Sequence, residues 1–146
     1  MNKKIFYVSI FLILVLFLSG CAGGYPTAPG TSTDEANIRI VINNYISAIN
    51  SKNWNSARSF CVYGSDAYFE VGQIESLINN MYSYCSIITI NYVANISYVS
   101  ISGNYAQAYT SLFTIMTCDG LGDSASSSAI IHLQKIGSNW KIYSTV

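Results

Sequence analysis

The hydrophobic positions of the chain change their period about halfway along it. From Ile38 to Ile49 apolar residues recur at helical spacing, and the same spacing returns from Ile74 to Cys85. From Ile87 onward apolar and polar residues alternate instead, which is the period of a β-strand. The pattern therefore predicts helices first and strands afterwards.

Three helices are predicted. Ser32 followed by Glu35 matches a capping box, and the helix that it opens ends near Ser51. Asn53 can cap a short second helix, and "VYGSD" breaks the chain before a third. Each helix carries an apolar stripe, which at this spacing forms core rather than a binding surface. The stripes consist of Ile38, Val41, Ile42, Tyr45, Ile46 and Ile49, then Trp54, Ala57, Phe60 and Cys61, then Ile74, Leu77, Ile78, Met81, Tyr82 and Cys85.

Four strands are predicted after the helices. The first two cover residues 87–102 and 105–117, with a Gly-Asn turn between them. "CDGLGDSASSS" is expected to be a polar loop, before a third strand at 129–136 and a fourth at 140–145. Trp140 should be buried where the last hairpin closes against the helices. Helices followed by an antiparallel meander predict an α+β fold, with the N-terminal helices packed against a strongly curved antiparallel sheet.

Three segments of the chain resemble the nuclear transport factor 2-like domains. "YISAINSKNWNSARSF" resembles the start of that fold, where a phrase of the type "aldagDyeaa" joins two helices. "SISGNYAQAY" and "IIHLQKIGSNWKIYS" resemble two of its hairpins. The resemblance covers residues 34–146 and implies a cone, in which a bent sheet wraps around the helices and often leaves a pocket. The family includes enzymes and non-enzymes, so the fold alone does not imply an activity.

A short hydrophobic run stands at the N-terminus. Ile5 to Leu18 is apolar apart from Ser9, follows two lysines, and is short for a spanning helix. A basic start, a short apolar run and small residues at the junction are typical of a secretory signal. "LSGC" at residues 18–21 resembles the lipobox of bacterial lipoproteins. That resemblance implies a signal peptide at residues 1–20, cleavage before Cys21, and a diacylglyceryl group on the Cys21 thiol.

The residues from 21 to 33 are expected to tether the domain to a membrane. "AGGYPTAPGTST" has two prolines and no apolar period, and twelve flexible residues reach roughly 20 Å. Lipid on Cys21 would hold the protein outside the cytoplasm, on the cell membrane or on an outer membrane where one exists. The alternatives are an uncleaved signal anchor and a secreted protein with a free cysteine at position 21.

The composition argues against several classes of partner. Charged residues make up 10% of the chain, against roughly 25% in a typical soluble domain. Removing Lys3 and Lys4 from the seven basic residues leaves five, against seven acidic ones, so nucleic acid is not an expected partner. With one histidine and no C-x-x-C pair, no metal site is expected. Without a Gly-rich phosphate loop or similar motif, no cofactor is expected.

Cys61, Cys85 and Cys118 remain in the domain besides Cys21. Disulfides persist outside the cytoplasm, so one bridge and one buried thiol are expected. Cys61 and Cys85 each end a predicted helix, and these ends can approach in a cone, so Cys61–Cys85 is the predicted bridge. The rival is Cys85–Cys118. It needs a bulge, because strand pairing about the Gly-Asn turn would place Cys85 opposite about position 122.

His132 is the one candidate catalytic residue. Enzymes of the family, such as ketosteroid isomerases and scytalone dehydratases, need a base in the pocket. His132 shares a strand face with Ile130 and Gln134, and it could be that base if this face lines the cone. Otherwise it is a half-exposed strand histidine. The carboxylates have structural explanations; Glu70 and Glu75, for example, open the third helix, where the helix dipole favours negative charge.

These observations predict a membrane-tethered extracytoplasmic lipoprotein. Because no second catalytic group accompanies His132, its domain is expected to be non-catalytic and to bind a small apolar ligand or another envelope protein. The alternative is a pocket enzyme of the isomerase or dehydratase kind that uses His132.

Overall fold

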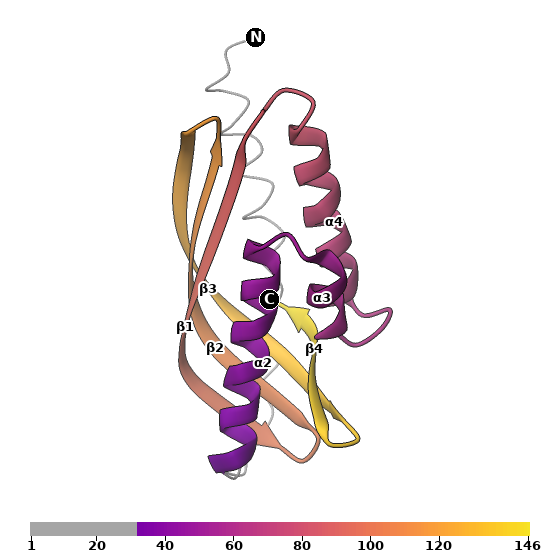
Figure 1. The fold of residues 1–146 in the computed structure, drawn as a ribbon. Helices are drawn as coiled ribbons and strands as arrows, with labels where there is room; N and C mark the ends of the chain where they lie inside the picture. The colour runs from indigo at the N-terminus through magenta and orange to yellow at the C-terminus, as the bar shows by residue number, and fades with distance from the viewer. Residues whose placement is uncertain (1–31) are drawn as a thin grey trace.

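Three helices lead the described part of the chain, in the order that the hydrophobic pattern predicts. The computed structural model describes residues 32–146. The helices run over Ser32–Asn50 (α2), Trp54–Ser59 (α3) and Asp66–Met81 (α4) (Figure 1). Asn53 caps α3 as predicted, because its side chain accepts a hydrogen bond from the backbone N–H of Ser56. Tyr82, which the spacing places in the stripe of α4, is instead 48% exposed because the helix ends before it.

The first 31 residues lie outside the described part of the chain. The signal peptide at 1–20, the lipidation site Cys21 and most of the tether at 21–33 therefore stay predictions. The first described helix already begins at Ser32, two residues before the predicted start of the domain. None of the helices in residues 32–146 is long and apolar enough to cross a membrane.

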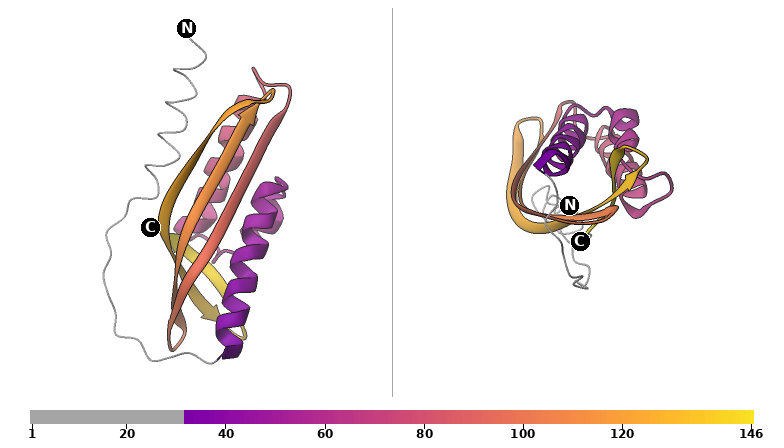
Figure 2. Two further views of the ribbon diagram at one scale, coloured as in Figure 1. Left: turned by 90° about the vertical axis from the view of Figure 1, so that its left-hand side faces the viewer. Right: turned by 90° about the horizontal axis from the view of Figure 1, so that it is seen from below.

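The strands form one antiparallel sheet in chain order, β1-β2-β3-β4. They run over Ile88–Ser102 (β1), Tyr105–Cys118 (β2), Leu121–Ile136 (β3) and Asn139–Thr145 (β4). The sheet curls around the helices, which is clearest when the molecule is seen from its end (Figure 2). This confirms the predicted α+β class, with N-terminal helices packed against a strongly curved antiparallel sheet.

The segment 118–128 is not the loop that its polar composition predicts. Only Asp119 and Gly120 turn the chain, both with positive φ (52° and 81°), and β3 begins directly after them. Ser126 then pairs with Phe113, and Ser128 with Ser111, along the full length of β2. Pairing with β2 therefore makes this segment a strand although its small polar residues favour a loop, since strand preference depends strongly on context.

The main core lies between the helices and the concave face of the sheet. Alternate residues of β2 and β3 are buried there, together with apolar residues of α2 and β4. They include Ala106, Ala108, Ile131 and Leu133 of the two strands, Ile38 and Ile42 of α2, and Ile142 of β4. Trp140 is 2% exposed, which confirms the expected burial of the closing hairpin. A smaller cluster, with Ile78, Met81, Ile88, Ile90 and Met116, lies where α4 ends and β1 begins.

The structure joins Cys85 to Cys118, with 5.4 Å between their Cα atoms, and leaves Cys61 as a buried thiol. The predicted bridge Cys61–Cys85 is corrected to its rival. Cys61 precedes α4 and Cys85 follows it, so the 16 residues of that helix, about 24 Å, keep the two apart. A bulge at Ser97 shifts the register of β1 and β2, so that Cys118 pairs with Ile88, close to Cys85 in the chain.

Candidate functional site

His132 lies on the outer, convex face of the sheet. Along β3, Ala129, Ile131 and Leu133 are buried in the core, and His132 alternates with them on the opposite side. Its half-buried ring lies 5.8 Å from the ring of Tyr143, and burial lowers its pKa. The face that carries His132 therefore does not line the cone, which corrects the proposal of His132 as the base of an interior pocket.

Four titratable side chains from different elements influence one another electrostatically beside the main core instead, one of them buried and three partly buried. They are Tyr45 of α2, Cys61 after α3, Glu70 of α4 and Tyr92 of β1. We call these four residues the interior cluster. Tyr45 and Tyr92 pack against the main core, and Cys61 belongs to it.

The helical phase of α4 brings Glu70 to this place. Ala67, Val71 and Ile78 form the buried face of the helix, and Glu70 falls in phase with them. The sequence alone predicts Glu70 at the opening of this helix, where the helix dipole favours a carboxylate. Its helical spacing from Ala67 and Val71 is the sequence signal that identifies it. A carboxylate within an apolar stripe is costly to bury, so its presence there points to a function.

The other members of the cluster are set by their own elements. Tyr45 continues the stripe of Ile38 and Ile42 along α2. Tyr92 lies two residues after the buried Ile90 and therefore on the same, inner side of β1. Cys61 lies beside Ile142 of β4, because the backbone of Ile142 hydrogen-bonds to Phe60 and Val62 on either side of it. The cluster around Glu70 therefore forms only when α2, β1 and the segment after α3 each pack in their places.

Glu70 changes charge near neutral pH. Burial, and then the nearby charge of Asp66, raise its pKa to about 7, although a hydrogen bond from Thr145 opposes the rise. Glu70 can therefore be either a neutral donor or an anionic acceptor under ordinary conditions.

The other three groups of the cluster stay protonated. Burial raises the pKa of Tyr92 to about 12, that of the Cys61 thiol to about 12, and that of Tyr45 well above its ordinary value. The phenols are thus hydrogen-bond donors, and Cys61 is not a reactive thiolate. In chemical terms the cluster offers one switchable carboxyl group and two phenols, set against an apolar core.

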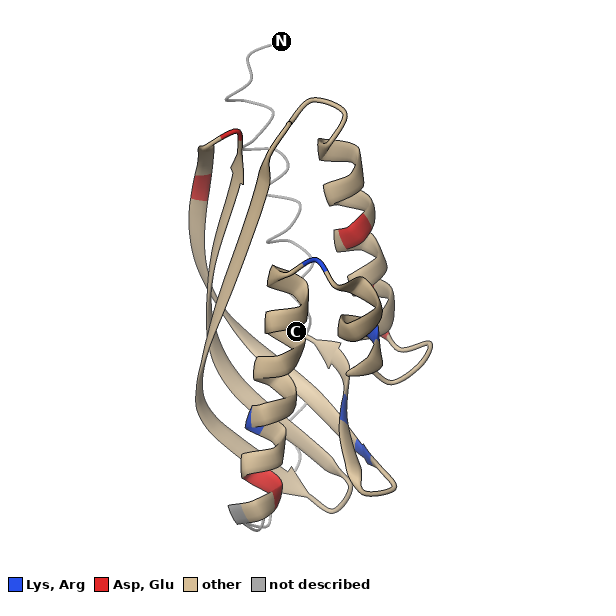
Figure 3. Cartoon of the chain, in the orientation of Figure 1, with Lys and Arg blue, Asp and Glu red and all other residues tan. Residues whose placement is uncertain are grey.

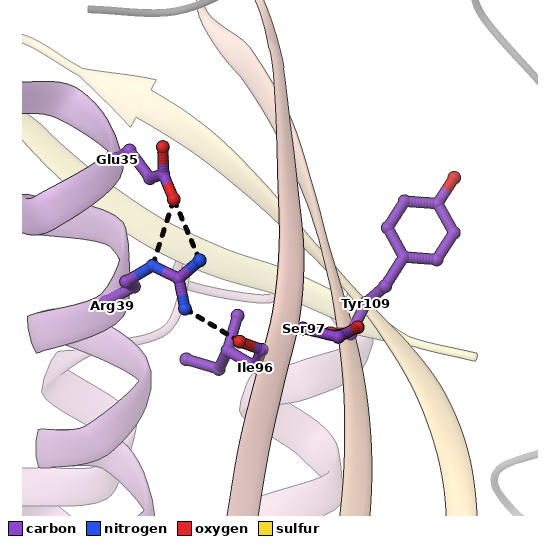
Figure 4. A network of polar contacts seen from close by, with 5 residues as sticks. All are labelled: Glu35, Arg39, Ile96, Ser97 and Tyr109. Carbon is purple, nitrogen blue, oxygen red and sulfur yellow. Dashed lines mark hydrogen bonds and ion pairs between the residues drawn. The ribbon is translucent and has the colours of Figure 1, made fainter. Parts of the chain in front are cut away.

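Helix α2 holds the strand that carries Tyr92. Asn50 accepts a hydrogen bond from the Tyr92 backbone N–H at 2.7 Å and donates one to its carbonyl at 2.9 Å. Arg39 donates to the Ile96 carbonyl beside the bulge, and Glu35 accepts two hydrogen bonds from that guanidinium (Figure 4). The open edge of β1 is thereby occupied by side chains of one helix.

Charged side chains lie mainly away from the long strands. Residues 88–118 contain no Lys, Arg, Asp or Glu, so β1 and β2 are uncharged throughout (Figure 3). Within residues 32–146, no group of three or more His, Cys, Asp and Glu side chains is arranged to hold a metal ion.

Solved structures with a similar fold share little sequence with this chain. A conserved protein from Planctomyces limnophilus DSM 3776 is 16% identical with a TM-score of 0.64, covering 79% of this chain and 94% of that one. A protein with a cystatin-like fold from Nostoc punctiforme PCC 73102 is 8% identical with a TM-score of 0.57, covering 81% and 92%. A ketosteroid isomerase-like protein from Erwinia carotovora atroseptica SCRI1043 is 13% identical with a TM-score of 0.60, covering 79% and 95%.

These structures define the class of fold. Residues 32–146 have the cystatin-like, nuclear transport factor 2-like architecture, in which three helices pack on a curled sheet of four antiparallel strands. At such low identities the likeness concerns the fold alone. No protein-family model and no curated protein matches the sequence.

Proposed function

We propose that this chain is a lipid-anchored extracytoplasmic protein whose domain binds a small, mainly apolar molecule inside the cone. The raised pKa of the half-buried Glu70 is the observation that carries the binding role. Keeping a carboxyl group in an apolar interior costs stability, and shifted pKa values of this kind concentrate at functional sites. Small-molecule sites typically combine an apolar lining with a few placed polar groups, and the interior cluster has this composition.

The anchoring part of the proposal rests on the N-terminal sequence. "LSGC" follows a short apolar run, and ten residues separate Cys21 from the start of α2. A coil-like tether of ten residues would reach roughly 17 Å, so the domain would stay close to the membrane that holds the lipid.

Replacing Cys21 tests the anchor. Cys21→Ser should release the domain from the membrane fraction or leave an uncleaved precursor, because the thiol that accepts the lipid is gone. Intact-mass measurement of the membrane fraction should find acyl chains on the wild-type Cys21. A serine variant that is processed and retained like the wild type would disprove the anchor and leave the binding role untouched.

Binding is tested by nuclear magnetic resonance with a panel of small apolar alcohols, amines and ketones. Shifts should concentrate at Tyr45, Glu70 and Tyr92, and the melting temperature should rise with ligand concentration by mass action. His132→Gln is the matched control and should bind as well as the wild type, because His132 lies on the outer face. Shifts confined to the outer face, around Tyr98 and Tyr109, would contradict the interior site.

The shifted pKa of Glu70 also favours a second candidate, a proton-transfer enzyme. A general base works best when its pKa is near the operating pH, and the pKa of Glu70 is about 7. The phenols of Tyr45 and Tyr92 could donate to a developing oxyanion. The isomerase-like neighbour from Erwinia is consistent with such chemistry on this fold.

Hydrogen–deuterium exchange distinguishes catalysis from binding. Enzymatic proton transfer should accelerate the exchange of cyclohexanone α-protons in heavy water, and Glu70→Gln should abolish the acceleration. Ketone binding without faster exchange would leave the binding module as the function.

A further inference from the structure

We infer that the molecule held by the interior cluster carries a protonated amine on an apolar body. This inference rests on the proposed binding function and specifies the chemistry of its ligand. It is carried by the arrangement of charges around Glu70.

The carboxylates of residues 32–146 are paired in a way that sets Glu70 apart. Of the other six, three form salt bridges, a fourth accepts two backbone hydrogen bonds, and Asp66 and Asp123 are exposed to solvent. The pairs are Asp34–Lys135, Glu35–Arg39 and Glu75–Arg58, and Asp119 accepts from the N–H groups of Ser86 and Ile87. Glu70 is half-buried and has no salt bridge to a cation of the described residues. Buried carboxylates are normally paired, so a ligand is a natural source of the missing positive charge.

The cations nearest to the cluster are already engaged. Arg58 pairs with Glu75, and its guanidinium lies 6.0 Å from the centre of the Tyr68 ring. Lys141 donates to the backbone carbonyl of Ser59. Both act electrostatically on the Cys61 thiol, whereas the charge that acts most strongly on Glu70 is the negative one of Asp66.

The remaining neighbours of Glu70 suit an ammonium group better than an anion. Asp66 lies one helical turn before Glu70, so a bound cation would relieve the repulsion between them, and a bound anion would increase it. Tyr45 and Tyr92 pack against the main core and would offer aromatic rings to a cation bound beside it, and Thr145, which hydrogen-bonds to Glu70, has a hydroxyl that can accept from an ammonium group. The apolar core around the cluster would contact the body of the ligand.

Such a ligand should bind better as the pH rises through neutrality. Glu70 must be ionised and the amine protonated, and the ionised fraction of a group of pKa about 7 rises from about 9% at pH 6 to about 91% at pH 8. The groups facing it from α2, α3, β1 and β4 do not change this sign. Tyr45, Cys61 and Tyr92 stay protonated, and Arg58 and Lys141 stay in their own contacts. Affinity for an amine should therefore increase about tenfold between pH 6 and pH 8.

Three probes with the same apolar body test this inference. 2-Phenylethylamine, 2-phenylethanol and phenylacetate are titrated into the wild type at pH 6 and pH 8, followed by nuclear magnetic resonance. The amine should bind about tenfold more tightly than the alcohol at pH 8, and phenylacetate most weakly. Glu70→Gln should remove the preference for the amine but keep the alcohol, which also shows that the variant is folded. Glu35→Gln is the control for the chemical change and should keep the preference.

The outcomes separate the inference from the function on which it rests. Equal binding of amine and alcohol at pH 8, or an amine preference that survives in Glu70→Gln, would overturn the amine inference and leave the binding role standing. Binding of phenylacetate above the amine would do the same. A protein that binds none of the three probes would contradict both the inference and the proposed binding function.

Discussion

Glu70 is a residue whose chemical type and position disagree. Its carboxyl is polar, yet its helical phase places it on the buried face of α4, between Ala67 and Val71. A polar group placed against apolar surface lowers stability, and residues required for function often destabilise the fold in this way. His132 shows the opposite case, since its chemistry suggested a catalytic role and its position on the outer face removes it from the interior.

The stability of the protein should reflect the charge of Glu70. Burial favours the neutral form, so the folded state binds more protons than the unfolded state between the ordinary pKa of 4.5 and the folded pKa of about 7. The wild type should therefore lose stability relative to Glu70→Gln as the pH rises from about 4.5 to 7, with no further change above that. Urea denaturation at several pH values measures this difference.

Glu75→Gln provides the matched control on the same helix. Glu75 pairs with Arg58, so removing its charge should destabilise the protein at neutral pH rather than stabilise it. A Glu70→Gln difference that is constant from pH 4.5 to 8 would show that the Glu70 carboxyl is well solvated.

At the scale of elements, helix α2 acts as a cover for the edge of the sheet. β1 is an edge strand without charged residues, the kind of edge that invites pairing with other chains. The side chains of Arg39 and Asn50 in α2, and of Lys52 in the turn after it, bind its backbone at Ile96, Tyr92 and Ile88, at every fourth residue. The alternation of β1 could be predicted from its sequence, but the helix that covers its edge could not, because these contacts join distant residues.

Removing the Asn50 side chain should weaken this cover. Asn50→Ala deletes two hydrogen bonds to Tyr92, and an unsatisfied backbone group costs about 1–3 kcal/mol where water cannot replace the partner. Chemical denaturation should show a loss of this size, and light scattering should show more self-association through the edge. Asn43→Ala, an exposed position on the same helix, should change neither. Equal behaviour of the two variants would mean that water substitutes for Asn50.

At the scale of the whole molecule, the disulfide joins the segment after α4 to the end of β2. Cys85 and Cys118 belong to the smaller core cluster, whereas Cys61 belongs to the main one. The bridge closes a loop with a sequence separation of 33 residues, for which the chain-entropy model gives about 3–4 kcal/mol. The bridge therefore adds stability to the smaller of the two core clusters, which buries fewer apolar residues than the main one.

Removal of the bridge should lower stability substantially without changing the fold. The double variant Cys85→Ala/Cys118→Ala should lose about 3–4 kcal/mol in denaturant unfolding. Peptide mapping without reductant should recover a Cys85–Cys118 peptide, with the Cys61 thiol alkylated only after unfolding, because it is buried. A peptide joining Cys61 to Cys85 would contradict the bridge described above.

The sequence by itself determined the order of the elements, the α+β class and the burial of Trp140, because hydrophobic period and helix caps are local signals. The prediction of a loop at residues 121–128 is wrong, because pairing with β2 overrides the polar composition there. Only the tertiary structure decided which face of β3 is buried, which cysteine bonds to Cys85 and which side chains surround Glu70. Each of these depends on the curl and register of the sheet, and hence on contacts between residues far apart in the chain.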